Sequence, residues 1–417
     1  MARRLLLIED IEEYRALVRV ALEQRGYEVI EANDGAAGLE AAQREHFDAI
    51  VLDLLMPRMH GFEVIERLRA DFATRATPII VLTSKSFAND QRQALAMGAN
   101  AVLTKPFDPA ALEDALNKHW WRTRVSFWGV RGSIASPGPE TVRYGGNTPC
   151  VTIEHGDQML ILDAGTGLRR LGMHLMRRAA GRPLELDMLV THTHWDHIQG
   201  FPFFVPAYVP GNKVRVYGPR SIDKPFARVI QGQQDPEYFP VALGDMAAAL
   251  EVHELRGEPV QIGPFHVTTA FMNHPGVTLG FRIEVDGQII TYATDTEPYA
   301  TMLAQARPEG GVGEAHGRQE DARLAALAQD ADLYIADSQY GPEEYRSKLG
   351  WGHTSYLDAM RMALHAKAKR VALFSHDPMH DDEMVDAKID ACRAFATEEG
   401  SDVEVIGAAE GLDIILR

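Results

Sequence analysis

Three things are scarce in this sequence: cysteine, long apolar runs and positive charge. Only Cys150 and Cys392 occur among 417 residues, which argues against a disulfide framework and favours two isolated thiols. No apolar run approaches the ~20 residues of a membrane span, and the run at 5–8 is too short for a signal-peptide core. We therefore expect a cytoplasmic protein that does not enter a membrane.

The charge balance limits the partners. With 42 basic against 59 acidic residues the net charge is -17, which disfavours a broad surface for nucleic-acid phosphates. No helix-turn-helix segment is left over to read a promoter, so DNA binding is not expected.

The length and the change of pattern along the chain predict two domains, residues 1–121 and 122–417. The first domain alternates strand and helix patterns five times, with strands expected at 5–8, 28–31, 49–52, 79–82 and 101–103. This alternation predicts an α/β fold with a five-stranded, doubly wound parallel sheet.

Polar residues stand where these strands end. Glu9 and Asp10 follow the first strand, Asp53 the third, Thr83 the fourth and Lys105 the fifth. Three carboxylates brought together repel one another unless a cation intervenes, and such hard oxygen ligands suit Mg²⁺. Taken singly, each is better explained as a solvated loop residue, but five in this order, followed by Pro106 and Phe107, favour a phosphoryl site.

This domain resembles a response-regulator receiver domain over its whole length. The resemblance implies that Asp53 accepts a phosphoryl group from a cognate histidine kinase. It also implies that Glu9 and Asp10 help to hold magnesium and that Thr83 and Lys105 contact the phosphoryl group. Receivers also act through dimerisation, so the resemblance is compatible with a homodimer.

A second set of metal-binding residue types lies in the rest of the chain. His192, His194, Asp196 and His197 follow an apolar, strand-like run at 186–190. Further candidates after apolar runs are His274, Asp295 and His376. A single histidine of this kind is more often structural, but burying the whole cluster without a cation would be costly. Imidazole and carboxylate donors suit zinc, and a carboxylate can bridge two ions.

The second domain resembles a metallo-β-lactamase-fold hydrolase of the ribonuclease Z-like phosphodiesterase branch. The residues that carry the likeness are FWGVRGS at 127–133, YGGNT at 144–148, LDAGTG at 162–167, THTHWDH at 191–197, NHPG at 273–276, DT at 295–296, GWGHT at 350–354 and SH at 375–376. The resemblance implies an αββα sandwich with two divalent ions, zinc first, with manganese or iron as alternatives. One ion would be held by His192, His194 and His274, and the other by Asp196, His197 and His376, with Asp295 bridging.

The expected chemistry is phosphodiester hydrolysis. His353 is expected to donate a proton to the leaving group, as the resemblance implies, while Asp196 and Asp295 orient the attacking hydroxide. Asp163 and Asp377 stand near strand ends and are expected to fix imidazole tautomers. A negative domain without an evident arm for RNA favours a small phosphodiester such as a cyclic nucleotide. Two alternatives stay open, a thioesterase or lactonase on the same fold and a non-catalytic, receiver-regulated interaction module.

Overall fold

The structure is a computed structural model that describes residues 3–71, 74–75, 77–84, 88–120, 123–221, 223–306 and 312–416. The chain divides into two compact units, with the main division after Arg122. Residues 121 and 122, between which the sequence places the domain boundary, lie outside the described residues. Among the described helices, none is both long and apolar enough to cross a membrane.

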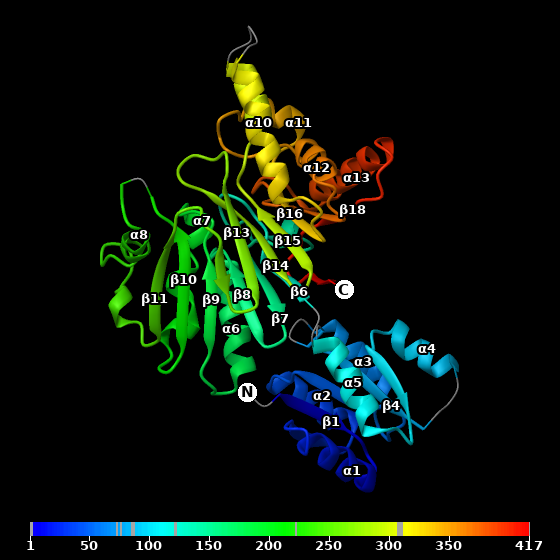
Figure 1. Ribbon diagram of the computed structural model, residues 1–417. Helices are drawn as coiled ribbons and strands as arrows, with labels where there is room; N and C mark the ends of the chain where they lie inside the picture. The colour runs from blue at the N-terminus through cyan, green and yellow to red at the C-terminus, as the bar shows by residue number, and fades with distance from the viewer. Residues whose placement is uncertain are drawn as a thin grey trace. The chain divides into compact units, whose positions relative to one another are not determined.

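The first unit is a parallel five-stranded sheet in the order β2-β1-β3-β4-β5. Its strands are β1 Arg4–Ile8, β2 Glu28–Ala32, β3 Ala49–Asp53, β4 Ile79–Thr83 and β5 Ala101–Thr104, and its helices are α1 Glu12–Glu23, α2 Gly35–Arg44, α3 Gly61–Ala70, α4 Ala88–Ala96 and α5 Pro109–Trp120. The doubly wound fold expected from the alternating pattern is confirmed (Figure 1).

Strand β1 shows why this sheet is covered on both faces. Leu6 and Ile8 pack into one apolar cluster, whereas Leu5 and Leu7 pack into another. Because successive side chains of a strand point to opposite faces, a continuous apolar run must have a core on each side. The polar residues that follow β1 and end β3 are therefore confined to the carboxyl edge of the sheet.

The second unit contains two seven-stranded sheets. The first sheet, in order, is β11 Ala249–Leu255, β10 Lys213–Pro219, β9 Glu185–Leu189, β8 Gln158–Leu162, β7 Cys150–His155, β6 Thr123–Gly129 and β19 Asp413–Leu416. The second is β12 Val260–Ile262, β13 Phe265–Phe271, β14 Leu279–Val285, β15 Gln288–Ala293, β16 Leu333–Asp337, β17 Arg370–Phe374 and β18 Glu404–Gly407.

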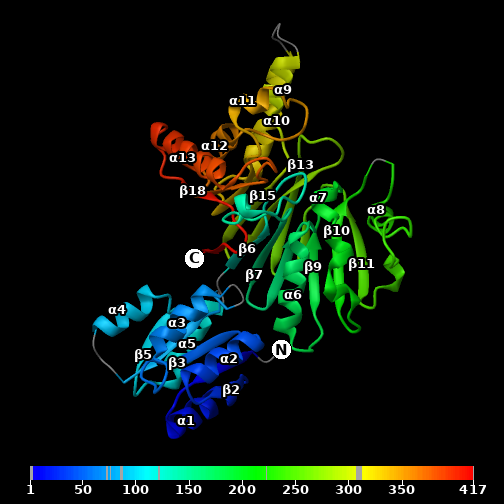
Figure 2. The same ribbon diagram turned by 180° about the vertical axis from the view of Figure 1, so that it is seen from behind.

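The two sheets enclose an apolar core, and helices cover their outer faces. Phe127 and Leu162 of the first sheet share one cluster with Phe281, Tyr292 and Phe374 of the second. The helices are α6 Gly167–Ala179, α7 Trp195–Ile198, α8 Phe226–Gly232, α9 Tyr299–Ala306, α10 Val312–Leu327, α11 Pro342–Arg346, α12 Tyr356–His365 and α13 Asp382–Glu398. Helix α6 lies over the first sheet (Figure 2), whereas α12 packs on β16 and β17, and α13 on β18, of the second sheet. The predicted αββα sandwich is thus confirmed.

The directions of the strands bring the loops that carry the predicted ligands to one edge of each sheet. Strands β8 and β9 are parallel, and so are β15, β16 and β17. Strand β13 runs the same way as β15, because each is antiparallel to β14. The carboxyl ends of these strands therefore open at one edge of each sheet, where the predicted metal ligands lie. Cys150 and Cys392 are both buried free thiols.

The sandwich core predicts a stability difference between two phenylalanines. Phe281 is 0 % exposed between the sheets, whereas Phe271, at the end of β13, is 55 % exposed. We expect Phe281→Ala to lower the free energy of unfolding by about 3–5 kcal/mol, because it leaves a cavity in a packed core. Phe271→Ala should cost under about 1 kcal/mol. Urea unfolding followed by circular dichroism measures both, and equal losses would contradict this account of the core.

Candidate metal centre and acidic pocket

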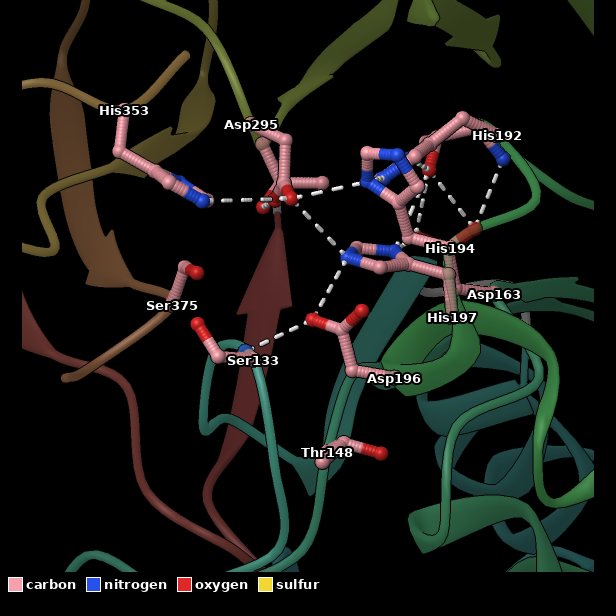
Figure 3. A network of polar contacts seen from close by, with 12 residues as sticks. Ser133, Thr148, Asp163, His192, His194, Asp196, His197, Asp295, His353 and Ser375 are labelled. Atoms are coloured by element: carbon pink, nitrogen blue, oxygen red, sulfur yellow. Dashed lines mark hydrogen bonds and ion pairs between the residues drawn. The ribbon is translucent and has the colours of Figure 1, made fainter. Parts of the chain in front are cut away.

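The central ligand cluster forms where the chain leaves β9 and turns into a short helix. His194 is still extended, with φ -67° and ψ 152°, and α7 begins at the next residue. This change of direction brings His192 and His194, from the extended part, to the same space as Asp196 and His197 of the helical turn (Figure 3).

Three imidazoles converge on one point. The Nδ1 atom of His194 lies 3.0 Å from Nε2 of His192 and 2.9 Å from Nε2 of His274. Burial lowers the pKa of His192 well below its usual value and that of His194 to a lesser degree, so both rings are neutral. Neutral imidazole nitrogens at such separations offer lone pairs to a shared cation, and these three residues form a group able to hold one.

Asp295 lies at the centre of the cluster (Figure 3). Its Oδ2 atom is 3.2 Å from Nε2 of His197 and 3.6 Å from Nε2 of His192. The same oxygen is 3.9 Å from Nε2 of both His274 and His353. One carboxylate within reach of four imidazoles is placed as a bridge between two cations would be.

His197 supplies the test of whether a cation fits. Its Nε2 atom is buried and has no hydrogen-bond partner among the described residues, although Oδ2 of Asp196 lies 3.4 Å away. Burial alone would lower the pKa of His197, but the charges of Asp295, Asp196 and Asp163 raise it well above its usual value. The three carboxylates thus favour positive charge at this position, and a divalent ion at Nε2 would supply it.

Buried groups fix the orientation of the ligands. Asp163, after β8, accepts a hydrogen bond of 2.8 Å from Nδ1 of His197 and also accepts from Thr191 and from the Tyr292 hydroxyl. The Nδ1 atom of His274 donates to the carbonyl of Gly352 at 2.8 Å. These bonds leave the Nε2 atoms of both histidines free to bind a metal. Asp163 thus contacts a predicted ligand directly, and its supporting role stays a prediction.

His376, a predicted ligand, does not lie with the other imidazoles of the cluster. Its ring is fully buried, with Nε2 donating to the carbonyl of Ala408 at 2.9 Å and Nδ1 lying 3.4 Å from Nζ of Lys388. Both nitrogens are thus turned into the protein. Asp377 accepts a hydrogen bond from the Met379 amide, and among the described residues it bonds none of the clustered imidazoles, so its supporting role stays a prediction.

The neighbouring residue faces the centre instead. The side chain of Ser375 points to the space beside Asp295, opposite that of Ser133 (Figure 3). Gln339 links the two serines, with Nε2 donating to Oγ of Ser133 at 3.2 Å and Oε1 accepting from Oγ of Ser375 at 3.4 Å. Sequence reasoning missed these residues, since serine and glutamine near strand ends give no distinctive signal.

His353 stands across Asp295 from the other imidazoles (Figure 3). Its Nδ1 atom donates to Oδ2 of Asp337 at 2.8 Å, and its Nε2 atom points to Asp295. Burial alone would lower its pKa, but the charges of Asp337 and Asp295 raise the pKa of His353 to about 9. Sequence reasoning missed Asp337. Its signal was an aspartate ending an apolar strand, the same placement as Asp53.

An open pocket gives access to this centre. It is lined by Ser133, Thr193, His194, Trp195, Asp196, Asp295 and His353. Trp195 is 80 % exposed although it lies between two candidate ligands in sequence. Exposing an indole is unfavourable, so its place at the mouth of a pocket suggests a contact with a bound molecule.

The first unit carries the acidic pocket that the sequence predicts. Glu9, Asp10 and Asp53 have oxygens within 4.8 Å of one another and form a group able to hold a cation. Nζ of Lys105 lies 3.1 Å from Oδ2 of Asp53 and also bonds Glu9. Oδ1 of Asp10 is buried without a hydrogen-bond partner among the described residues, which fits a cation ligand. Thr83 ends the neighbouring strand β4 and is buried.

The electrostatics of this pocket centre on Lys105. Burial raises the pKa of Glu9, and the charge of Asp53 adds to the effect. Burial opposes the charge of Lys105, but Glu9 and Asp53 together raise its pKa, so the ammonium stays protonated. A protonated lysine beside Asp53 is suited to bind the oxygens of a phosphoryl group there.

Two family models match the chain. A response regulator receiver domain matches residues 5–117, and a β-lactamase superfamily domain matches residues 158–376, just over half of the chain. Among curated proteins, the alkaline phosphatase synthesis transcriptional regulatory protein PhoP of Bacillus subtilis is 35 % identical over 140 residues. That alignment covers 34 % of this chain and 54 % of PhoP. The chain thus spans only about half the length of that relative.

Solved structures resemble the second unit at low identity. The metallo-β-lactamase fold protein YhfI of Bacillus subtilis is 18 % identical, with a TM-score of 0.48 over 71 % of this chain and 99 % of that one. The short form of human tRNase Z is also 18 % identical, with a TM-score of 0.46 over 70 % of this chain and 98 % of that one.

The position of His376 yields a test of the ligand set. We expect His192→Ala to lose zinc, because it removes one of three converging nitrogens. His376→Gln should keep the wild-type zinc content, because that ring bonds a backbone carbonyl instead of the centre. Zinc per chain after loading and gel filtration, measured by mass spectrometry, separates the two. Equal loss in both variants would restore His376 as a ligand.

Proposed function

Because the chain belongs to the β-lactamase superfamily and also carries a receiver domain, we propose that it is a response regulator with a metal-dependent phosphodiesterase as its output. A receiver domain takes its phosphoryl group from a histidine kinase, and in this proposal Asp53 is the acceptor and Mg²⁺ the ion held by Glu9, Asp10 and Asp53. Phosphorylation would then switch hydrolysis at the metal centre.

The ligand geometry supports a centre of two divalent ions. One would be held by His192, His194 and His274, which form a group able to hold a cation. The other would be held by His197 and Asp196, whose Nε2 and Oδ2 atoms are 3.4 Å apart, with Asp295 shared. Zinc is our first choice, with manganese or iron as alternatives, because imidazole and carboxylate donors suit all three. When bound, such ions act as Lewis acids that lower the pKa of water and neutralise phosphate oxygens.

The observation that carries the proposal is the His353–Asp337 pair. Asp337 holds the Nδ1 proton of His353, so Nε2 is aimed at the space beside Asp295 and carries the proton that can be given away. A leaving alkoxide is strongly basic and needs that proton, whereas a leaving thiolate, with a pKa of about 8.5, does not. A charged acid at this place therefore favours phosphodiesters over thioesters, while a lactone would also release an alkoxide.

Two carboxylates of the chain, those of Asp196 and Asp295, are proposed to position the attacking water. Asp196 is fixed by a 2.8 Å hydrogen bond from the backbone amide of Ser133 to its Oδ2 atom. Asp295 lies between His197 and His353, so in this proposal it orients the attacking water while His353 protonates the leaving group. In-line displacement requires the attacking and the leaving oxygen to stand on opposite sides of the phosphorus.

The exposed indole of Trp195 bears on the substrate. It lines the same pocket as Asp295 and His353 and offers an aromatic face to a bound group. A nucleobase would stack there and recover the cost of exposing the ring, with a benefit of about 1–3 kcal/mol per base. We therefore favour a small nucleotide-containing phosphodiester, such as a cyclic nucleotide.

The role of His353 is tested with two classes of leaving group. We expect His353→Ala to slow hydrolysis of a cyclic nucleotide by about 10²–10⁴-fold, because the alkoxide leaves without a proton. Bis(p-nitrophenyl) phosphate should be far less affected, since p-nitrophenolate leaves unprotonated. Steady-state kcat/KM for both substrates measures the difference, with metal content as the control for an intact centre. An equal loss on both substrates would contradict a proton-donor role.

The same assay separates the rival functions. Turnover of a thioester or a lactone without any phosphodiester turnover would refute the phosphodiesterase. No turnover of any class by the metal-loaded protein would favour an interaction module.

Trp195→Ala should raise KM for the nucleotide substrate, because the stacking surface for the base is lost, and should leave KM for a dialkyl phosphate unchanged.

Regulation is tested at Asp53. We expect acetyl phosphate with Mg²⁺ to label the wild-type protein and to change its kcat/KM, because a phosphoryl group adds negative charge beside Lys105. Asp53→Asn should neither be labelled nor respond. Identical kinetics of labelled and unlabelled wild-type protein would refute the switch while leaving the hydrolase intact.

A further inference from the structure

The side chain of Ser133 lines the pocket together with Asp295 and His353. We infer that its hydroxyl donates a hydrogen bond to a non-bridging oxygen of the substrate phosphate. The amide of Gln339 holds the hydroxyl in the orientation that this bond needs. The inference rests on the proposed function and adds to it a residue that binds the substrate anion.

The orientation of the Gln339 amide is fixed by its neighbours. The side chain is buried, and its Nε2 atom lies 3.2 Å from Oγ of Ser133, 3.4 Å from the hydroxyl of Tyr340 and 3.5 Å from Oδ2 of Asp377. If the amide were turned over, Oε1 would face the carboxylate of Asp377, and two acceptors would repel each other. The group next to Ser133 is therefore Nε2, which donates to its hydroxyl oxygen.

The amide gives two serines opposite roles in hydrogen bonding (Figure 3). A hydroxyl has one proton and two lone pairs. Ser375 donates its proton to Oε1 of Gln339 at 3.4 Å, so only lone pairs remain for other partners. Ser133 accepts from Nε2 instead, and in the part of the chain that the structure describes no acceptor is bonded to its own proton. That proton is available to a phosphate oxygen in the pocket.

The backbone places Ser133 at the pocket and makes room for the amide. Ser133 has a φ of 63°, and its N–H donates to Oδ2 of Asp196 at 2.8 Å. The residue before it is Gly132, where a Cβ atom would stand 2.6 Å from both Oε1 of Gln339 and Oγ of Ser375. Glycine at this position therefore lets the amide lie between the two serines.

A donor held in this way suits an anion better than water. Ser133 is exposed, whereas Gln339 beside it is 2 % exposed, so a buried polar group is used to orient an exposed one. Hydrogen bonds to a charged acceptor are about twice as strong as those between neutral groups. A donor that is already oriented also needs no reorganisation when negative charge develops on the phosphate.

The test measures affinity for inorganic phosphate, which needs no turnover. The full-length protein is loaded with zinc, freed of excess metal and titrated with phosphate in a calorimeter. We expect Ser133→Gly to weaken phosphate binding by about 10- to 100-fold, because a donor to a charged acceptor is lost. Glycine adopts positive φ readily and keeps the N–H that bonds Asp196, so zinc per chain should equal that of the wild type. Unchanged phosphate affinity would overturn the inference.

A second serine provides a matched comparison. Ser375 faces the same space and also has positive φ, 56°, so Ser375→Gly removes a hydroxyl from an equivalent backbone. It should weaken phosphate binding much less than Ser133→Gly, because its proton is bonded to Gln339. Ser136→Ala, whose hydroxyl bonds the carbonyl of Ile134, should bind phosphate as the wild type does. Equal losses in the two glycine variants would contradict their opposite roles.

The positioning role of Gln339 is tested by Gln339→Glu, which keeps the shape of the side chain but accepts at both oxygens. The carboxylate would take the Ser133 proton, so the hydroxyl remains but no longer donates to the pocket. The added charge also repels phosphate, and the same substitution in the Ser133→Gly protein measures that repulsion alone. We expect the loss of phosphate affinity to be at least about 10-fold larger when Ser133 is present.

Equal losses with and without the Ser133 hydroxyl would show that Gln339 does not act through it. Should Gln339→Glu not fold, the comparison of Ser133→Gly with Ser375→Gly still decides whether Ser133 is the donor.

The outcome is separable from that of the proposed function. Weakened phosphate binding in Ser133→Gly together with hydrolysis of thioesters alone would keep the anion contact and refute the phosphodiesterase. Phosphodiester turnover together with unchanged phosphate affinity in Ser133→Gly would do the reverse.

Discussion

The second unit depends on the balance of charge around His197. Three buried carboxylates, those of Asp163, Asp196 and Asp295, surround this one imidazole, and their charges raise its pKa well above the usual value. Burying that much negative charge between two sheets is tolerated only if positive charge is brought in with it. Cations at the centre would meet this need, so metal binding would also stabilise the fold at this edge of the sheets.

This constraint explains the backbone at the site. Ser133, Asp163, Asp295 and Ser375 all have positive φ, between 56° and 63° for the two serines and between 53° and 61° for the two aspartates. Residues other than glycine adopt this conformation at a cost, and they do so where the surroundings require a side chain in one place. Here the side chains must converge on one point. Neighbouring strands would otherwise place their end residues at intervals along the edge of the sheet.

The fold could be predicted from the sequence because the patterns typical of strands and helices recur along the chain. Apolar runs of strand length, separated by helix patterns, gave the first unit, and the ligand motifs after apolar runs located the centre. Most of the predicted ligands are brought together, from His192 to His274 and Asp295. His376 lies apart from them because Ser375 adopts a left-handed conformation after the end of β17, with φ 56°, so the alternation of the strand does not continue into the loop. Asp337 was missed because its role exists only through His353, which lies in a separate loop.

The proposed switch needs only a modest energy. Couplings between regulatory and functional sites are about 1–3 kcal/mol, which corresponds to roughly 5- to 150-fold in affinity. In the receiver, Lys105 is shared between Glu9 and Asp53, and a phosphoryl group on Asp53 would draw the ammonium towards itself. Redirecting one charge-assisted hydrogen bond changes the energy by an amount of this order. The acidic pocket can therefore bias an equilibrium of the receiver without any rearrangement of its core.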